Sequence, residues 1–260
     1  MQQKIVLPFL TALALLTRFP VPRSTFADCG SEAACTALQA RSTLFYSLVG
    51  ALLAMVMGMV SVITSLAFSP LVQALVVVVL WIALTGALHL DGLADCVDAA
   101  FASHKDPRRT LAVLRDPAAG PMAVIALVLV VLTKMVFIAE LLMTTLPSMT
   151  VLILTLAISR QLAVLYMAAT PYARQEGMVS ALDLHGYQVP LFVISLILCL
   201  LCFFLLGLLT LLIVLAGVGT LFFLWRRYWL KKLGGYTGDC VGALIELSEL
   251  VILFIFLLFR

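Results

Sequence analysis

The 260-residue sequence contains very little charge: Asp, Glu, Lys and Arg make up 11% of the residues. Soluble domains carry about 25% of such residues, so this deficit excludes an ordinary soluble protein. The sequence also lacks a long polar stretch that could fold as a separate soluble unit, and it has no visible repeat or low-complexity tract. We therefore predict a single membrane-embedded domain over residues 1–260.

Cysteines are too scattered to indicate a thiol-based site. The six cysteines show no zinc-binding spacing, and two of them, Cys199 and Cys202, lie inside an apolar run. A disulfide framework or a zinc site is therefore not expected, and we predict reduced thiols that pack in the protein interior.

Long apolar runs make up most of the sequence. A helix needs about 20 apolar residues to cross a bilayer, and seven stretches approach or exceed that length. They cover residues 42–68, 71–90, 119–143, 150–170, 189–206, 207–225 and 243–260, and Gly207 marks a hairpin between two of them. The predicted fold class is an all-α, polytopic helical bundle in the membrane, with about 6–8 spanning helices.

A shorter apolar stretch, Ile5–Leu16, lies near the start of the chain. It resembles a signal peptide in length, but Arg18 and Pro20 follow it before any small-residue cleavage site. We therefore expect a retained short helix, either interfacial or re-entrant.

The basic residues indicate an orientation in the membrane. Twelve of the 16 Lys and Arg residues fall in segments 18–41, 101–118, 171–187 and 226–240, which alternate with the predicted spans. Because loops rich in Lys and Arg stay on the cytoplasmic side, we predict that these segments face the cytoplasm from the inner membrane. Most acidic residues fall on the same side, which indicates an active site facing the cytoplasm rather than a path open to both sides.

Three of the 13 acidic residues, Asp91, Asp95 and Asp98, lie within eight residues directly after the apolar run 71–90. We expect that run to continue as a helix to about residue 100, which places the three carboxylates on one helix face. Like charges so close repel each other, and a bound cation relieves the repulsion. Oxygen ligands favour Mg²⁺ or Mn²⁺ over zinc, so we predict a Mg²⁺ site here, with Gly92 leaving room for a substrate.

A second acidic element, GGYTGDCVGALIELSE, covers residues 234–249. Gly235 and Gly238 predict a loop that can approach a phosphate closely. Asp239 either caps the following helix or acts in the site. Glu246 lies in an apolar helix, where carboxylates tend to be functional or paired.

Three further polar residues each have two interpretations. Arg160 is a cation inside an apolar segment, so it either binds substrate or pairs internally with Glu246 or Glu249. Asp116 either caps the helix that follows it or joins the metal site. His89 either reaches the substrate or packs in the protein core.

A Mg²⁺ ion held by few carboxylates is typical of phosphate chemistry, in which cationic side chains also bind the phosphates. Arg174 lies in a loop otherwise nearly free of basic residues, so we predict that it holds a phosphate. Two alternatives to the enzyme described next stay open: a CDP-alcohol-type membrane phosphotransferase, and a divalent cation transporter that uses the same carboxylates.

At these motifs the sequence resembles the cobalamin synthase family, the adenosylcobinamide-GDP ribazoletransferases. The matching stretches are LLTRFPVP at 15–22, TGALHLDGLADCVDA at 85–99, LRDPAAG at 114–120, SR at 159–160, YARQEG at 172–177 and GGYTGDCVGALIELSEL at 234–250. They occur in the family's order over nearly the whole chain.

The resemblance implies an integral membrane enzyme that joins adenosylcobinamide-GDP to α-ribazole, or its 5′-phosphate, and releases GMP, with Mg²⁺ required. On this interpretation Asp91, Asp95 and Asp98 hold the metal, and Asp98, Asp239 or His89 acts in catalysis. The expected substrate-binding residues are Gly92, Asp116, Arg160, Arg174, Gly235, Gly238, Asp239 and Glu246. The expected partners are the two substrates and the lipid bilayer but no nucleic acid, with a homo-oligomer or other enzymes of the pathway left open.

Overall fold

The computed structural model of the protein describes residues 2–22, 32–102, 106–114, 116, 118–173 and 182–259. Over these residues the chain is helical, with no strand and one isolated backbone bridge, between Tyr172 and Tyr236. The predicted all-α class is therefore confirmed for the part of the chain that is described.

The bundle consists of long helices and shorter helical elements. The long helices are α4 (Tyr46–Thr64), α8 (Pro121–Leu142), α9 (Ser148–Ala169), α10 (Gln188–Leu206), α11 (Leu208–Leu233) and α12 (Gly238–Leu258). The shorter elements are α1 (Gln2–Leu16), α3 (Glu32–Ser42), α5 (Pro70–Thr85), α6 (Leu88–Phe101), α7 (Pro107–Val113) and the 3-10 turns η1 (Thr43–Phe45) and η2 (His185–Tyr187). Among the described residues, six segments are long and apolar enough to cross a membrane, and α5 with α6 adds a seventh if the pair is one broken span. Six and seven spans both lie within the predicted range of about 6–8 spanning helices.

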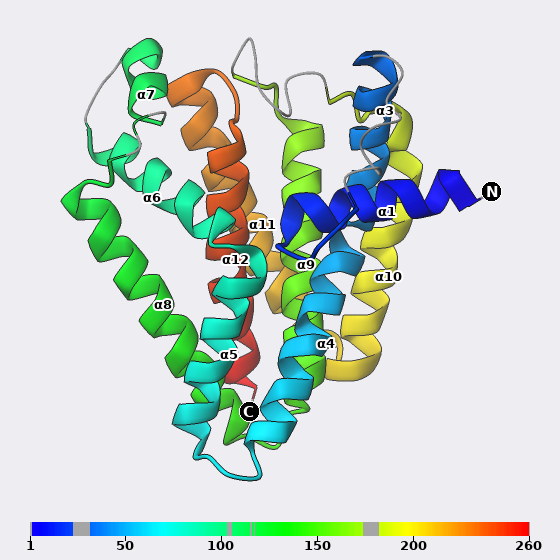
Figure 1. Ribbon diagram of the computed structural model, residues 1–260, viewed down its shortest axis with the longest axis vertical. Coiled ribbons are helices and arrows are strands. Elements are labelled where there is room, and N and C mark those ends of the chain that lie inside the picture. Colours follow the sequence, from blue (N-terminus) through cyan, green and yellow to red (C-terminus); the bar gives the residue numbers. More distant parts are fainter. Residues whose placement is uncertain are drawn as a thin grey trace.

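The polar connections gather at one end of the bundle (Figure 1). α6, α7, the end of α11 and the start of α12 lie at that end, which is drawn at the top. The α4–α5, α8–α9 and α10–α11 turns and the end of α12 lie at the other. For the described residues, this arrangement agrees with the predicted alternation of loops, while the side of the membrane that each end faces stays a prediction.

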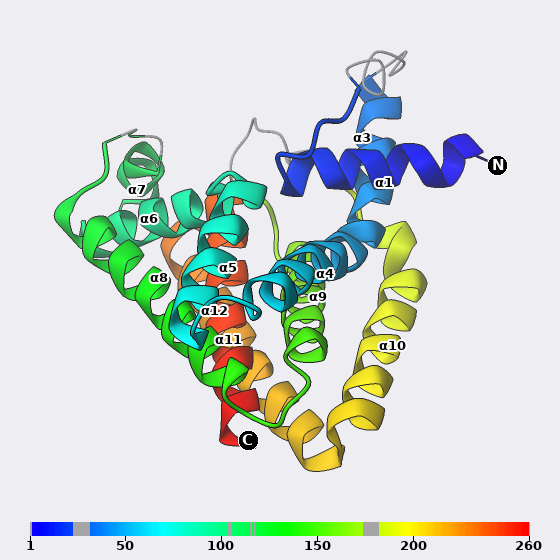
Figure 2. The ribbon, with the colours of Figure 1, turned by 60° about the horizontal axis from the view of Figure 1, so that its bottom comes forward.

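α1 lies across the bundle rather than along it (Figures 1 and 2). It packs against α3 and α4, and its apolar part, Ile5–Leu16, is too short to cross a bilayer as a straight helix. The Arg18 amide donates to the Leu84 carbonyl oxygen at 2.7 Å, which fastens the segment after α1 to the end of α5. The short N-terminal helix is confirmed, and its interfacial or re-entrant place in the membrane stays a prediction.

The predicted single helix from residue 71 to about residue 100 is wrong. Gly86 and Ala87 adopt left-handed backbone conformations, with φ of 62° and 58°, and α6 runs at 86° to α5. Glycine commonly ends a helix in this conformation, whereas alanine is strained there. The apolar pattern continues through both helices, so periodicity does not reveal the bend. The three aspartates nevertheless lie on one helix, α6, as predicted.

Gly207 separates α10 from α11 with a φ of 89°, which confirms the predicted hairpin. α11 then continues past the predicted end at residue 225 as far as Leu233. Arg226, Arg227, Lys231 and Lys232 therefore lie on a helix and not in a loop, at the polar end of the bundle.

α6 packs against α12 through two glycines. A Cβ atom on Gly92 would lie 2.8 Å from the Asp239 carbonyl oxygen, and one on Gly242 would lie 3.2 Å from the His89 Cα. Small residues allow helices in membrane proteins to approach closely. This contact brings together two acidic motifs that are far apart in the sequence.

Candidate functional site

The three aspartates of α6 have different surroundings. Asp91 is exposed at the start of the helix, whereas Asp95 and Asp98 are partly buried. For the residues described, no group of three or more His, Cys, Asp or Glu side chains is arranged to hold a metal ion. The helix therefore presents the three carboxylates in the predicted order, but they do not form a three-ligand cage.

Asp98 binds the N-terminus of α8. Its Oδ2 accepts a hydrogen bond from the Gly120 amide at 2.6 Å, and its Oδ1 accepts one from the Ala123 amide at 3.2 Å. Backbone amides at a helix N-terminus lack partners within the helix and carry partial positive charge, so a carboxylate is favourable there. Asp98 thus links α6 to α8. It binds the amides at the start of α8, a role that the sequence analysis gave to Asp116 as one of two alternatives.

Asp116 makes a local turn instead. Its Oδ1 accepts a hydrogen bond from the Ala118 amide at 3.0 Å, two residues further along the chain, and its side chain is exposed. The interpretation of Asp116 as the cap of α8 is therefore wrong, because α8 begins only at Pro121 and its first amides are bound by Asp98. A role of Asp116 in binding substrate stays a prediction.

Asp239 lies in the first turn of α12, against α6. Thr237 is the N-cap, and its Oγ1 accepts from the Cys240 amide at 3.4 Å, so the alternative of Asp239 as the cap is wrong. The Thr237 hydroxyl also donates to Asp239 Oδ2 at 3.1 Å. The Asp239 backbone lies against Gly92, so this acidic residue of α12 is next to the helix that carries Asp91 and Asp95.

The glycine loop before α12 pairs with the chain that follows α9. The Tyr236 amide donates to the Pro171 carbonyl oxygen, and the Ala173 amide donates to the Tyr236 carbonyl oxygen, both at 2.9 Å. Gly235 is required for this pairing, because a Cβ there would collide with Pro171. Among the described residues, no neighbouring atom lies within 4 Å of a Cβ on Gly238, so the start of α12 is open there.

Burial raises the pKa of the Tyr236 phenol, and the neighbouring Tyr172 adds to the effect, so Tyr236 is neutral at ordinary pH. The two rings lie edge to face, with centroids 5.3 Å apart. Arg174, which we predicted to hold a phosphate, lies outside the described residues.

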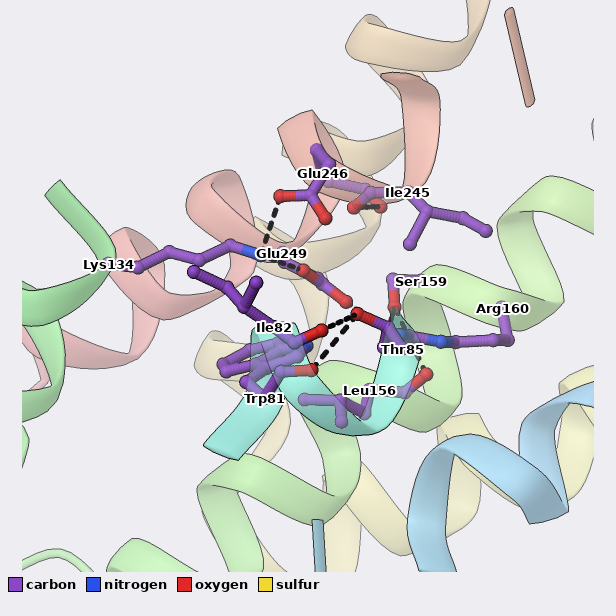
Figure 3. A network of polar contacts seen from close by, with 11 residues as sticks. Trp81, Ile82, Thr85, Lys134, Leu156, Ser159, Arg160, Ile245, Glu246 and Glu249 are labelled. Carbon is purple, nitrogen blue, oxygen red and sulfur yellow. Dashed lines mark hydrogen bonds and ion pairs between the residues drawn. The ribbon is translucent and has the colours of Figure 1, made fainter. Parts of the chain in front are cut away.

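Deeper in the bundle, four charged side chains form a buried ionic network (Figure 3). Lys134 Nζ lies 2.7 Å from Glu246 Oε2 and 2.5 Å from Glu249 Oε2, and Arg160 pairs with the other oxygen of Glu249. Arg160 and Glu249 are both fully buried. Buried ions are stable only when they are paired. The structure therefore supports the internal pairing of Arg160 that was left open, and its predicted contact with substrate, like that of Glu246, stays a prediction.

Sequence reasoning missed part of this network. Lys134 was recognisable as an intramembrane cation, but its two carboxylate partners lie more than 100 positions away, and no local pattern connects them. The ring of Trp81 also contacts Lys134, with the nitrogen 4.2 Å from the ring centroid. An isolated Lys in an apolar run is the only signal for these contacts.

His89 lies inside the α6–α12 contact. It is 3% exposed, and neither ring nitrogen has a hydrogen-bond partner among the described residues. This placement favours the interpretation of a packed histidine, and its predicted catalytic role stays a prediction.

Two basic residues at the polar end bind helix C-termini. Lys232 Nζ donates to the carbonyl oxygens of Ala99 and Ala100, at 2.5 and 3.2 Å, at the end of α6. Arg226 donates twice to the carbonyl oxygen of Ala169, at the end of α9. Cations are favourable at helix C-termini, where carbonyl groups lack partners. These contacts hold α6 and α9 in place around the glycine loop.

In the part of the chain that is described, six apolar segments, or seven if α5 and α6 form one broken span, define a polytopic integral membrane protein, and two acidic motifs pack together at one end of the bundle. The chain belongs to the CobS family, described as cobalamin-5-phosphate synthase, whose model matches residues 8–257.

Relatives of known name match over nearly the same length. A protein of Stutzerimonas stutzeri (strain A1501) is 39% identical over 253 residues, which cover 96% of this chain and 94% of the relative. One of Pseudomonas paraeruginosa (strain PA7) is 42% identical over 249 residues, with coverage of 94% and 95%. Both carry the name adenosylcobinamide-GDP ribazoletransferase. No solved structure matches this chain.

Proposed function

We propose that this protein is an adenosylcobinamide-GDP ribazoletransferase, the membrane enzyme that assembles the nucleotide loop of cobalamin. The family match over residues 8–257 and the names of the relatives support this activity. The structural observation that supports it most directly is the contact between Gly92 and Asp239, because it joins the two acidic motifs at the polar end. These findings favour neither the CDP-alcohol phosphotransferase nor the cation transporter.

The proposed site includes Mg²⁺, for which the donor chemistry is suitable. In enzymes that act on phosphates, Mg²⁺ usually takes one or two protein carboxylates and completes its shell with water and substrate oxygens. Asp95 and the exposed Asp91, one turn before it on α6, provide such a set, and among the described residues they need no preformed cage. When bound, the metal neutralises negative charge on the diphosphate of the donor.

In the reaction, a ribose hydroxyl of α-ribazole attacks the phosphorus attached to the cobinamide arm. The new oxygen–phosphorus bond forms as the bond to the GMP oxygen breaks, and GMP leaves. The hydroxyl proton passes to a carboxylate, and we assign this role to Asp239. Asp98 is less suitable as the base, because both of its oxygens already accept backbone amides.

The remaining residues of the site bind and orient the substrates in this proposal. Among the described residues, Gly238 leaves open space at the start of α12, where a phosphate can approach the backbone. Arg174 supplies the positive charge for the phosphates. The site faces the cytoplasm, which the distribution of basic residues supports. A homo-oligomer or contacts with other enzymes of the pathway stay predictions.

The experiment that tests this function uses the purified full-length protein in detergent with Mg²⁺, adenosylcobinamide-GDP and α-ribazole. The expected products are the corresponding cobalamin and GMP, in equal amounts. A CDP-alcohol consumed in place of these substrates would support the first alternative. Divalent cation uptake into proteoliposomes that Asp95→Ala abolishes would support the second, and either result without cobalamin formation would refute the proposal.

A further inference from the structure

A separate cavity of about 420 Å³ lies at the polar end of the bundle, beside the loop that carries Tyr236. Its walls come from residues 167–172 at and after the end of α9, from residues 182–185, and from Tyr236. Cavities of about 300–1,000 Å³ are typical of sites for small organic ligands. The volume is too small for a corrinoid ring but suits a mononucleoside.

One wall of the cavity contains a buried polar group without a partner. Thr170 lines the cavity and is 6% exposed, and its Oγ1 makes no hydrogen bond to any described residue. Buried hydroxyl groups in proteins are nearly always hydrogen-bonded, so such a group indicates a ligand or water partner. A second wall is aromatic, since the rings of Tyr172 and Tyr236 meet edge to face.

Among the described residues, the charge of the lining favours a neutral occupant over an anion. Asp183 is the single residue there with a full charge, since no Lys or Arg is among the described lining residues. A phosphate would meet this carboxylate without a compensating cation, whereas a neutral sugar can donate hydroxyl hydrogen bonds to it. Aromatic rings bind the flat face of a heterocyclic base.

We infer that this cavity is the subsite for the acceptor nucleoside, with the base of α-ribazole against Tyr172 and Tyr236 and its sugar near Thr170. This inference rests on the proposed function and specifies which substrate lies on which side of the site. Tyr236 precedes Asp239 by three residues, and Thr237 between them donates to the Asp239 carboxylate. The loop therefore connects the acceptor subsite to the acidic residues that we assign to the transfer.

The test compares Tyr172→Leu and Thr170→Val with the wild type, and uses Thr64→Val at the opposite end of the bundle as the matched control. We expect Tyr172→Leu to raise KM for α-ribazole about tenfold, the factor that corresponds to ~1.4 kcal/mol. Thr170→Val should raise it about threefold through the lost hydrogen bond. KM for adenosylcobinamide-GDP and kcat should stay unchanged in both variants.

Three outcomes would overturn the inference. The first is a rise in KM for adenosylcobinamide-GDP instead of α-ribazole, which would place the guanine in this cavity. The others are an unchanged KM for both substrates and a fall in kcat alone. If Tyr172→Leu does not fold, Thr170→Val decides, because valine has nearly the same shape as threonine.

If the wild-type protein forms no cobalamin, the proposed function fails, and equilibrium titration with α-ribazole then tests the subsite alone. Loss of α-ribazole binding in both variants would support the subsite, and equal binding to all proteins would refute it.

Discussion

Asp98 is the residue for which sequence and structure give opposing predictions. The spacing of the α6 aspartates predicts a metal ligand, whereas its two hydrogen bonds to the Gly120 and Ala123 amides indicate a link between α6 and α8. Replacing a side chain that caps a helix N-terminus by Ala costs about 1 kcal/mol, and the lost charge at that terminus adds about 0.5–1 kcal/mol. We therefore expect Asp98→Ala to destabilise the protein by about 2 kcal/mol.

The assay is thermal unfolding of the purified protein in detergent, together with activity as a function of Mg²⁺ concentration. A loss of about 2 kcal/mol lowers the melting temperature of a chain of this size by about 5 °C. Asp91→Ala is the comparison variant, because Asp91 is exposed in the first turn of α6 and should lower the melting temperature by less than Asp98→Ala does. The Mg²⁺ concentration for half-maximal activity should not change in Asp98→Ala.

Gly120→Ala provides an independent way to break the same link. A Cβ on Gly120 would lie 2.8 Å from Asp98 Oδ1, so the carboxylate must move away from the α8 amides. The two substitutions disrupt one contact, and their combined effect on stability should be smaller than the sum of the single effects. An unchanged melting temperature in Asp98→Ala, with a raised Mg²⁺ requirement, would refute this reasoning and restore Asp98 as a ligand.

Two further predictions concern the packing of charged and small residues. Glu249→Gln leaves the buried Arg160 without its counterion, so it should destabilise the protein by about 3 kcal/mol, measured by thermal unfolding. The double variant Glu249→Gln/Arg160→Met should recover part of this lost stability. No recovery would argue against a stabilising pair. Gly92→Ala should abolish activity, because the new Cβ would push α12 away through the Asp239 backbone. Gly219→Ala should retain activity, because a Cβ there meets no described atom within 4 Å. Equal activity of the two variants would contradict the tight contact between α6 and α12.

The sequence was sufficient to predict the class of fold and the gathering of polar motifs at one end. Long apolar runs require spanning helices, and Gly207 interrupts one of these runs at the position where the hairpin forms. The same apolar pattern could not reveal the bend at Gly86 and Ala87, because side chains on both sides of it are equally apolar. Local pattern therefore predicts helices well and their directions poorly.

The partners of the polar residues were harder to predict than their positions. Asp98 accepts hydrogen bonds from two amides that lie 22 and 25 residues further along the chain, at the start of α8. Lys134 forms ion pairs with carboxylates of α12. Such contacts depend on how the helices pack, and spacing within one helix does not determine them. Arg160 was the exception, because a cation in an apolar segment requires a counterion, and the apolar part of the last helix offers Glu246 and Glu249.

The central claim is that transfer takes place where α6 meets the first turn of α12. The most direct measurement is the rate of GMP release from adenosylcobinamide-GDP in the presence of α-ribazole, for Asp95→Asn and Asp239→Asn against the wild type. Both variants should lose activity by a factor of about 100 or more while keeping the wild-type melting temperature. Either variant releasing GMP at the wild-type rate would contradict the claim.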